Sequence, residues 1–220
     1  MWLLHLDVVP EIGRAWAELS PREALRATRF RTDDDRHRYI AQSAGLRRVL
    51  RRYGVDPGTS ELQSGANGKP VLPHPTDIRF NASRSGRHVL IGVTCGTEVG
   101  VDVEQIRPMA DLDAFTHSAL DREERAELAV MDPDERLIAA LHTWTAKEAV
   151  LKGTGDGLSI DPSRFGFERR PAGTPWRPRT EPGLERLTAW SVVHLPPDDV
   201  VAAIALPRER WRTRIETLVT

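Results

Sequence analysis

The sequence has little of what marks secreted, membrane-spanning or nucleic-acid-binding proteins. It holds one cysteine, Cys95, which excludes an internal disulfide and belongs to no zinc-binding pattern. No apolar run approaches the roughly 20 residues of a spanning helix, and the apolar start of the chain lacks the basic residues of a signal peptide. Acidic and basic residues nearly cancel, at 32 and 31, for a net charge of −1. This balance disfavours a nucleic-acid or membrane partner, and the single cysteine indicates a reducing, cytoplasmic compartment.

Lysine is also scarce, because only three of the 31 basic residues are lysines, namely Lys69, Lys147 and Lys152. In a chain that prefers arginine so strongly, a retained lysine is expected where a compact ammonium is needed and a planar guanidinium would not fit. The alternative is a coding bias toward arginine, which would scatter the three lysines at random.

Strands and helices recur in both halves of the 220-residue chain without regular βαβ alternation, which favours an α+β fold. The residue pattern predicts strands at 2–8, 88–93, 99–104, 165–168, 190–194 and 200–206. It predicts helices that begin at Ser20, near 32 and near 133, the last two ending at Gly54 and Gly153. The segments 55–80 and 171–183 are rich in proline and glycine, so they are predicted to be mainly loops.

Two carboxylates share one face of a predicted strand. Side chains alternate along 100–104, so Val101 and Val103 face the core. Asp102 and Glu104 then lie together on the opposite face, where they repel each other unless a cation lies between them. A hard cation such as Mg²⁺ prefers oxygen ligands of this kind and completes its coordination with water and phosphate oxygens. The alternative is an edge strand with a solvated acidic face.

The helix at 133–152 places further charged groups beside each other. Residues three and four positions apart share a helix face, and this rule puts on one stripe Trp144, Lys147, Glu148, Leu151 and Lys152. A carboxylate beside two ammonium groups could cradle metal-bound phosphates. The alternative is an ordinary salt-bridged helix surface.

Arginines are concentrated in the N-terminal quarter of the chain. Arg26, Arg29 and Arg38 flank the break between two predicted helices, where several guanidinium groups could grip a phosphate. The four arginines of 47–52 are instead predicted to form the solvated face of the second helix. An Arg-rich nucleic-acid-binding module is the alternative function of this region, and its binding would depend steeply on salt but not on Mg²⁺.

Four motifs in a fixed order resemble those of the surfactin-synthetase-activating (Sfp-type) 4′-phosphopantetheinyl transferases. They are GKP at 68–70, FNASRSG at 80–86, GVDVE at 100–104 and WTAKEAVLKGTGDGL at 144–158. The similarity extends from the segment SPREALRATRF, which begins at Ser20, to the loop after Lys152. All three lysines fall within these motifs, which is not what random scatter predicts.

The resemblance implies a fold and a reaction. The fold would consist of two similar α+β subdomains, 1–98 and 99–220, related by a pseudo-twofold axis in a monomeric protein. The second subdomain would carry the metal site, and coenzyme A would bind in the cleft between the two. The reaction would move the 4′-phosphopantetheine arm of coenzyme A to a serine of an apo acyl or peptidyl carrier protein, releasing adenosine 3′,5′-bisphosphate.

The resemblance also assigns roles to the metal-binding and catalytic positions. Asp102, Glu104 and Glu148 would hold Mg²⁺ on the pyrophosphate. Lys152 would contact the phosphates and offset the charge that develops on the leaving group. Glu148, or a metal-bound water, would help to deprotonate the attacking serine. Lys147 belongs to the same Lys-Glu pair, and its role is left open between contact and packing.

Further positions would bind coenzyme A. Lys69, together with Gly68 and Pro70, would lie against the adenosine portion. Ser83 would lie against a phosphate, and the family's 3′-phosphate contacts correspond to Arg26 and Arg38.

One motif departs from the family pattern, because the family commonly has Ser-His-Ser where this chain has Arg84 between Ser83 and Ser85. Unlike histidine, Arg84 cannot lose its charge, although it could still bind a phosphate through two hydrogen bonds. The alternative function is therefore a coenzyme A- or carrier-binding protein without turnover.

The carrier protein would dock beside the catalytic helix. Four apolar residues of 109–120 are predicted to help to hold a carrier helix, namely Met109, Leu112, Phe115 and Leu120.

Overall fold

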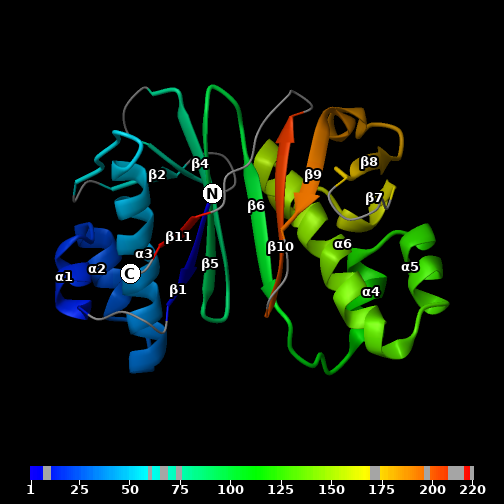
Figure 1. The fold of residues 1–220 in the computed structure, drawn as a ribbon, viewed down its shortest axis with the longest axis horizontal. Coiled ribbons are helices and arrows are strands. Elements are labelled where there is room, and N and C mark those ends of the chain that lie inside the picture. The colour runs from blue at the N-terminus through cyan, green and yellow to red at the C-terminus, as the bar shows by residue number, and fades with distance from the viewer. Residues whose placement is uncertain are drawn as a thin grey trace.

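The computed structural model describes residues 1–6, 11–58, 61–64, 69–72, 76–168, 174–195, 199–207 and 216–218 (Figure 1). The elements of the first half are β1 (Trp2–His5), α1 (Ile12–Ala17), α2 (Pro21–Ala27), α3 (Asp33–Arg51), β2 (Gln63–Ser64), β3 (Pro70–Val71), β4 (Ile78–Ser85) and β5 (His88–Cys95). Those that follow are β6 (Gly100–Gln105), α4 (Leu112–Ala119), α5 (Arg122–Ala129), α6 (Pro133–Thr154), β7 (Phe165–Glu168), β8 (Arg177–Thr180), β9 (Trp190–His194), β10 (Val200–Pro207) and β11 (Glu216–Leu218).

The chain repeats one topology. In the first half a strand, β1, is followed by the long helix α3 and the antiparallel pair β4–β5, and β5 lies between β1 and β4. In the second half β6 is followed by the long helix α6 and the antiparallel pair β9–β10, and β10 lies between β6 and β9. This repeat fits the predicted α+β fold of two similar halves.

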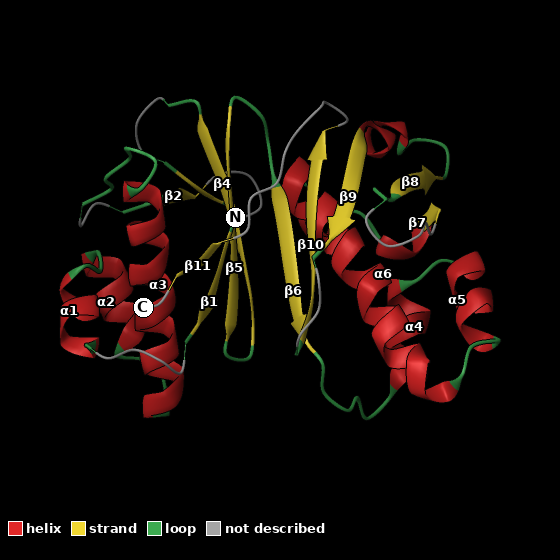
Figure 2. Cartoon of the chain, viewed as in Figure 1, coloured by secondary structure: helices red, strands yellow, loops and turns green. Residues whose placement is uncertain are grey.

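The two sheets lie face to face with helices on their outer sides. Figure 2 shows α1, α2 and α3 beside the first sheet and α6 beside the second. An apolar layer fills the space between the sheets, and it includes Leu90 of β5, Val101 and Val103 of β6, and Ile204 of β10. A Cβ at Gly92 would lie 2.7 Å from Val101 Cγ1, so the missing side chain lets the sheets approach.

The last described strand crosses between the halves. Residues 216–218 form β11, which pairs in parallel with β1 at the edge of the first sheet. The division at 1–98 and 99–220 stays a prediction, and β11, from the second of these ranges, pairs with a strand of the first. No helix in the described ranges combines the length and apolarity needed to cross a membrane.

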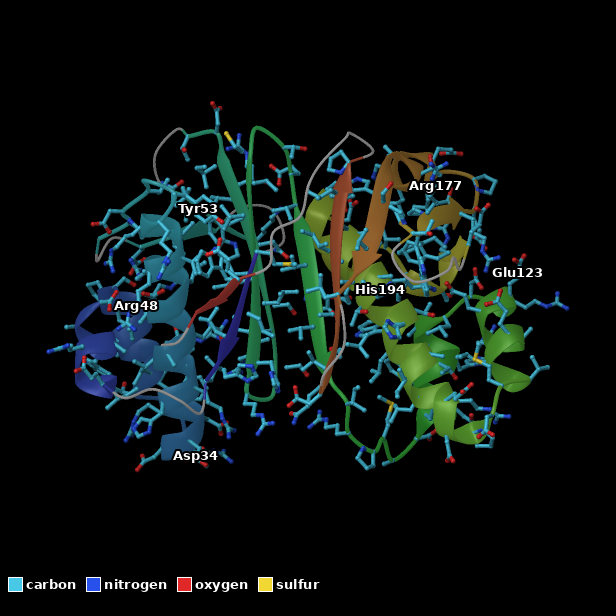
Figure 3. The ribbon with its side chains drawn as sticks, in the orientation of Figure 1. Asp34, Arg48, Tyr53, Glu123, Arg177 and His194 are labelled. Carbon is cyan, nitrogen blue, oxygen red and sulfur yellow. The ribbon has the colours of Figure 1, made fainter. Side chains whose placement is uncertain are left out.

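The helix starts agree with the residue pattern, but one helix end does not. Ser20 and Glu23 form a capping box at α2, and Thr32 caps α3, whose first turn carries three aspartates. Figure 3 shows one of them, Asp34, at the start of α3. The prediction that α6 ends at Gly153 is wrong, because the helix runs to Thr154. It ends at Gly155, whose φ of 80° is the left-handed conformation that favours glycine.

Predictions for several short elements and for the arginines of 47–52 also differ from the structure. The elements that were not predicted include α1, α5, β4 and the short strand β8, which lies inside the segment 171–183 predicted as a loop. The prediction that the arginines of 47–52 form a solvated face is wrong for Arg47, which is fully buried. Its guanidinium contacts Glu23 Oε2 at 2.7 Å and donates to the carbonyl of Gly58. Arg48 instead pairs with Glu18 on the outer side of α3 (Figure 3).

His88 lies buried at the start of β5, beside His5, Arg87 and Asp199. Its Nδ1 has no hydrogen-bond partner within the described part of the chain. Burial lowers the pKa of His88 below its usual 6.5, and the Asp199 carboxylate offsets only part of this effect. The fold therefore favours the neutral ring. Its stabilisation is complete above the unfolded-state pKa and is lost as the pH falls through the lower folded-state pKa.

We therefore expect His88 to contribute a decrease in the free energy of unfolding as the pH is lowered from about 7.5 to about 5. In His88→Gln this decrease should be smaller, because the buried group that must take up a proton is gone. Urea denaturation across this pH range measures both slopes, and His117→Gln, at an exposed histidine of α4, is the control. A His88→Gln variant with the wild-type pH slope would contradict the assignment.

Candidate active site

The candidate site begins at β6, where the predicted alternation holds. Val101 and Val103 lie in the apolar layer between the sheets. Asp102 is on the other face of the strand and is only 2% exposed, while Glu104 is half-buried. The interpretation of a solvated acidic face therefore fails for Asp102. A buried carboxylate needs compensating contacts, and these come from α6 and β4.

A glycine brings α6 close to β6. A Cβ at Gly100 would lie 1.8 Å from the carbonyl oxygen of Ala149, so no other residue allows this approach. Inside α6, a Cβ at Gly153 would lie 2.4 Å from the Trp190 ring, so this glycine serves helix packing. With α6 at this distance, Glu148 and Lys152, one turn apart, both reach the carboxylates of β6.

Lys152 occupies the centre of the site. Its Nζ lies 2.6 Å from Asp102 Oδ1, 2.9 Å from Ser83 Oγ and 3.7 Å from Glu148 Oε2. Ser83 Oγ in turn lies 2.7 Å from Asp102 Oδ1. The structure thus brings together four of the predicted site residues, contributed by β4, β6 and α6.

Two carboxylate oxygens of this cluster stay without a hydrogen-bond partner among the described residues. They are Asp102 Oδ2 and Glu148 Oε1, and both are buried. Burial raises the pKa of Asp102 to about 6, although Lys152 and Ser83 act in the opposite direction. Burial also raises the pKa of Glu148, and the nearby charge of Glu104 adds to this effect while Lys152 opposes it. Such unsatisfied carboxylate oxygens are suited to a cation or to a proton.

The carboxylate oxygens of the site are of the type that a hard divalent cation prefers, but their side chains are not arranged as a metal-binding group. Across the described ranges, no three Asp, Glu, His or Cys side chains form a group arranged to hold a metal ion. The Lys152 ammonium instead provides the positive charge beside Asp102. Of the predicted ligands, Asp102 and Glu148 contact this ammonium, and Glu104 lies close enough for its charge to act on both of their carboxyl groups. The unpartnered oxygens of Asp102 and Glu148 are the feature that suits a metal.

Lys147 does not take part in this cluster, contrary to the prediction of a two-lysine phosphate cradle. It is fully buried, and its Nζ lies 2.6 Å from Glu124 Oε2 on α5. It also donates to the carbonyl oxygens of Ala119 and Pro162, at 3.0 and 2.9 Å. Neighbouring helix residues point about 100° apart, so Lys147 faces α5 and β7 while Glu148 faces β6. Lys147 therefore serves packing within the protein and not contact with a ligand.

Lys69 lies at the junction of the two halves. Its Nζ is 2.9 Å from Glu98 Oε2 and 3.5 Å from the carbonyl oxygens of Val99 and Gly153, the latter near the end of α6. Pro70 begins β3, directly after Lys69. Gly68 lies outside the described residues. The adenosine-binding role of this motif remains a prediction.

The predicted phosphate-gripping arginines lie on the helices of the first half. Arg26 of α2 stacks over the Tyr39 ring at 5.3 Å and lines an open pocket of about 540 Å³. Arg22 and Arg29 line the same pocket, whereas Arg38 is half-buried on α3. Arg84 is exposed on β4 and so lies on the face of the strand away from Ser83. Contacts of these arginines with coenzyme A stay predictions.

The predicted carrier-docking residues are only partly accessible. Leu120 is fully buried, and Phe115 packs edge-on against Trp144 with ring centroids 5.6 Å apart. The prediction is therefore wrong for Leu120, which belongs to the core under α4. Met109, in the loop before α4, is 37% exposed and is the most accessible residue of this group, while Leu112 and Phe115 are half-buried.

Two polar residues that contact β6 were not predicted as part of the site, namely Asn81 and Ser85. Their signal was present in the pattern Asn-x-Ser-x-Ser, which places residues 81, 83 and 85 on one face of a strand. Glu124, the buried partner of Lys147, was also not predicted, because nothing local distinguishes this carboxylate from the others of α5.

A lysine beside buried carboxylates that keep unpartnered oxygens is suited to binding metal-bound phosphate groups. A sequence profile of the 4′-phosphopantetheinyl transferase superfamily matches residues 98–205. The chain is 34% identical to the 4′-phosphopantetheinyl transferase HetI of Nostoc sp. over 223 residues, which cover 97% of this chain and 90% of HetI. It is 30% identical to the 4′-phosphopantetheinyl transferase Sfp of Bacillus subtilis over 156 residues, which cover 70% of this chain and 68% of Sfp.

Among solved structures, the holo-[acyl-carrier-protein] synthase of Thermotoga maritima matches 52% of this chain and 64% of its own chain, with 17% identity and a TM-score of 0.42. The chain belongs to the 4′-phosphopantetheinyl transferase superfamily, and the resemblance drawn from its motifs is confirmed.

Proposed function

We propose that this protein is a holo-[carrier-protein] synthase. It transfers the 4′-phosphopantetheine arm of coenzyme A to a serine of an apo carrier protein and releases adenosine 3′,5′-bisphosphate. The observation that carries this proposal is the cluster of Lys152, Asp102 and Ser83, with unpartnered carboxylate oxygens on Asp102 and Glu148. The names of the relatives HetI and Sfp support the same activity.

The reaction needs charge neutralisation and positioning more than a covalent intermediate. The carrier serine Oγ bonds to the phosphorus atom that bears the pantetheine arm, and the bond from that phosphorus to the bridging pyrophosphate oxygen breaks. The serine proton passes to Glu148, whose buried carboxyl has a raised pKa suited to accept it. Lys152 turns from Asp102 toward the phosphates and offsets the negative charge of the leaving group.

Magnesium is the proposed metal cofactor. When bound, Mg²⁺ would neutralise the pyrophosphate and polarise it for in-line displacement. Asp102, Glu104 and Glu148 would hold it, because they offer the carboxylate oxygens that this hard ion prefers. The raised pKa of Asp102 fits a carboxylate whose negative charge needs a cation nearby.

We propose that coenzyme A binds to residues of the first half of the chain and to the region where the two halves meet. Lys69, which already lies beside Gly153 at the end of α6, would contact the adenosine portion together with Pro70 and Gly68. The 3′-phosphate would bind to Arg26 and Arg38. We also propose that the protein is a monomer and that it is located in the cytoplasm.

The test is intact-mass spectrometry of an apo carrier protein incubated with this protein, coenzyme A and Mg²⁺. We expect the carrier to gain the mass of one phosphopantetheine arm, and EDTA to prevent the gain. Carriers of fatty-acid, polyketide and peptide synthesis are tested side by side. If no carrier gains mass although coenzyme A binds, the protein is a binding protein without turnover and the proposal fails.

A further inference from the structure

Three side chains of β4 reach across to β6. Asn81, Ser83 and Ser85 are spaced two residues apart and therefore share one face of the strand. Asn81 Oδ1 accepts a hydrogen bond from the backbone N–H of Val101 at 2.9 Å. Because β4 and β6 belong to different sheets, these side chains join the two strands where no backbone ladder does.

The hydrogen-bond direction at Ser83 is fixed by its neighbours. Lys152 Nζ lies 2.9 Å from Ser83 Oγ, and an ammonium can only donate, so the hydroxyl oxygen accepts from it. The hydroxyl proton is then donated to the other neighbour, Asp102 Oδ1, at 2.7 Å. Asp102 is thereby held by one oxygen, while its buried Oδ2 is left without a partner among the residues that the structure describes.

Ser85 repeats this arrangement two residues further along β4. The backbone N–H of Gln105 donates to Ser85 Oγ at 3.1 Å. The hydroxyl proton of Ser85 is therefore donated to Glu104 Oε2, at 2.6 Å. Two serines of one strand thus hold two carboxylates of the facing strand, each through one carboxylate oxygen.

We propose that Ser83 and Ser85 are positioning residues for the metal-binding carboxylates. They fix the side-chain orientation of Asp102 and Glu104 so that the opposite carboxylate oxygens are presented to the cation. Hydrogen bonds to metal-binding carboxylates commonly raise metal affinity by 10- to 100-fold. This inference rests on the proposed metal site. It deepens that site by assigning a role to Ser85 and a second role to Ser83 beside its predicted phosphate contact.

The same geometry explains why the residue between the serines can vary. Arg84 is exposed and points to the opposite face of β4, away from both carboxylates. An arginine in place of the family's histidine therefore leaves the serine face unchanged. Position 84 can differ without disturbing the way in which Asp102 and Glu104 are held.

The experiment measures Mn²⁺ binding by electron paramagnetic resonance in the presence of coenzyme A, and coenzyme A binding by calorimetry without metal. Ser85→Ala should raise the Kd for Mn²⁺ by about tenfold, with coenzyme A affinity unchanged within about twofold. Ser85→Thr, which keeps the hydroxyl, should retain most of the wild-type Mn²⁺ affinity. The control is Ser43→Ala, which removes a buried serine hydroxyl that bonds Tyr39 on α3.

Ser85→Ala with wild-type Mn²⁺ affinity overturns the proposal, even if its melting temperature has fallen, because the serine then serves only to join the strands. If Ser85→Ala does not fold, Ser85→Cys takes its place, since a thiol has nearly the same shape but is a weak donor. A wild-type protein that binds no Mn²⁺ refutes the metal site of the proposed function itself. Normal wild-type binding with no effect of Ser85 refutes only this inference.

Discussion

Asp102→Asn is expected to reduce the rate of phosphopantetheine transfer by about 10³-fold. The substitution keeps the shape of a buried side chain but removes the negative charge that Lys152 contacts at 2.6 Å. A neutral amide is also a poor ligand for a hard divalent cation. Both effects act where the pyrophosphate would be neutralised, so the rate of the chemical step should fall while coenzyme A still binds.

The measurement is the initial rate of mass gain by the apo carrier at saturating coenzyme A and Mg²⁺, together with the melting temperature. Asp134→Asn, at an exposed aspartate in the first turn of α6, is the matched control and should keep the wild-type rate. The melting temperature of Asp102→Asn should stay close to that of the wild type, because the variant also removes an unfavourable buried charge. A rate within about tenfold of the wild type would show that Asp102 is not part of the catalytic machinery.

Local rules were sufficient to predict the acidic half of the site. Alternation along β6 places Asp102 opposite the core, and the spacing of four residues in α6 places Glu148 and Lys152 on one face. Both expectations hold in the structure, because strand and helix periodicity depend only on backbone geometry. The same rules did not predict the contacts of Lys147. Residues 147 and 148 share one broad stripe of α6, but Lys147 faces α5 and β7 whereas Glu148 faces β6.

What could not be predicted depends on packing between distant segments. Arg47 is buried because Glu23 of α2 and the carbonyl of Gly58 surround its guanidinium, and no pattern within α3 reveals those partners. The β4 strand was missed because its residues 81–85 are mostly polar, which is atypical of a strand that packs against a second sheet. Its polar face is explained by contacts with β6, which lies 19 to 20 residues away in the sequence: two serines bond carboxylates of β6, and Asn81 accepts from the backbone N–H of Val101.

The largest loss of stability is expected from Lys147→Ala. Glu124 is 1% exposed, and it accepts hydrogen bonds from the backbone N–H groups of Asp121 and Phe167 in addition to its contact with Lys147. Burial raises the pKa of Glu124 and lowers the pKa of Lys147, so each charge is stable only because the other is present. Removing the ammonium leaves a buried unpaired carboxylate and a cavity, at a cost of about 3–5 kcal/mol. The melting temperature should fall by about 10 °C.

Calorimetry of Lys147→Ala, Lys147→Met, Glu124→Gln and the double variant Lys147→Met/Glu124→Gln separates the charge from the packing. Methionine fills most of the lysine volume, so Lys147→Met isolates the unpaired charge of Glu124. The double variant should be more stable than Lys147→Met, because neutralising Glu124 removes the buried charge that the single substitution leaves unpaired. Equal melting temperatures for the wild type and Lys147→Met would show that the ion pair does not hold α5 and β7 against α6.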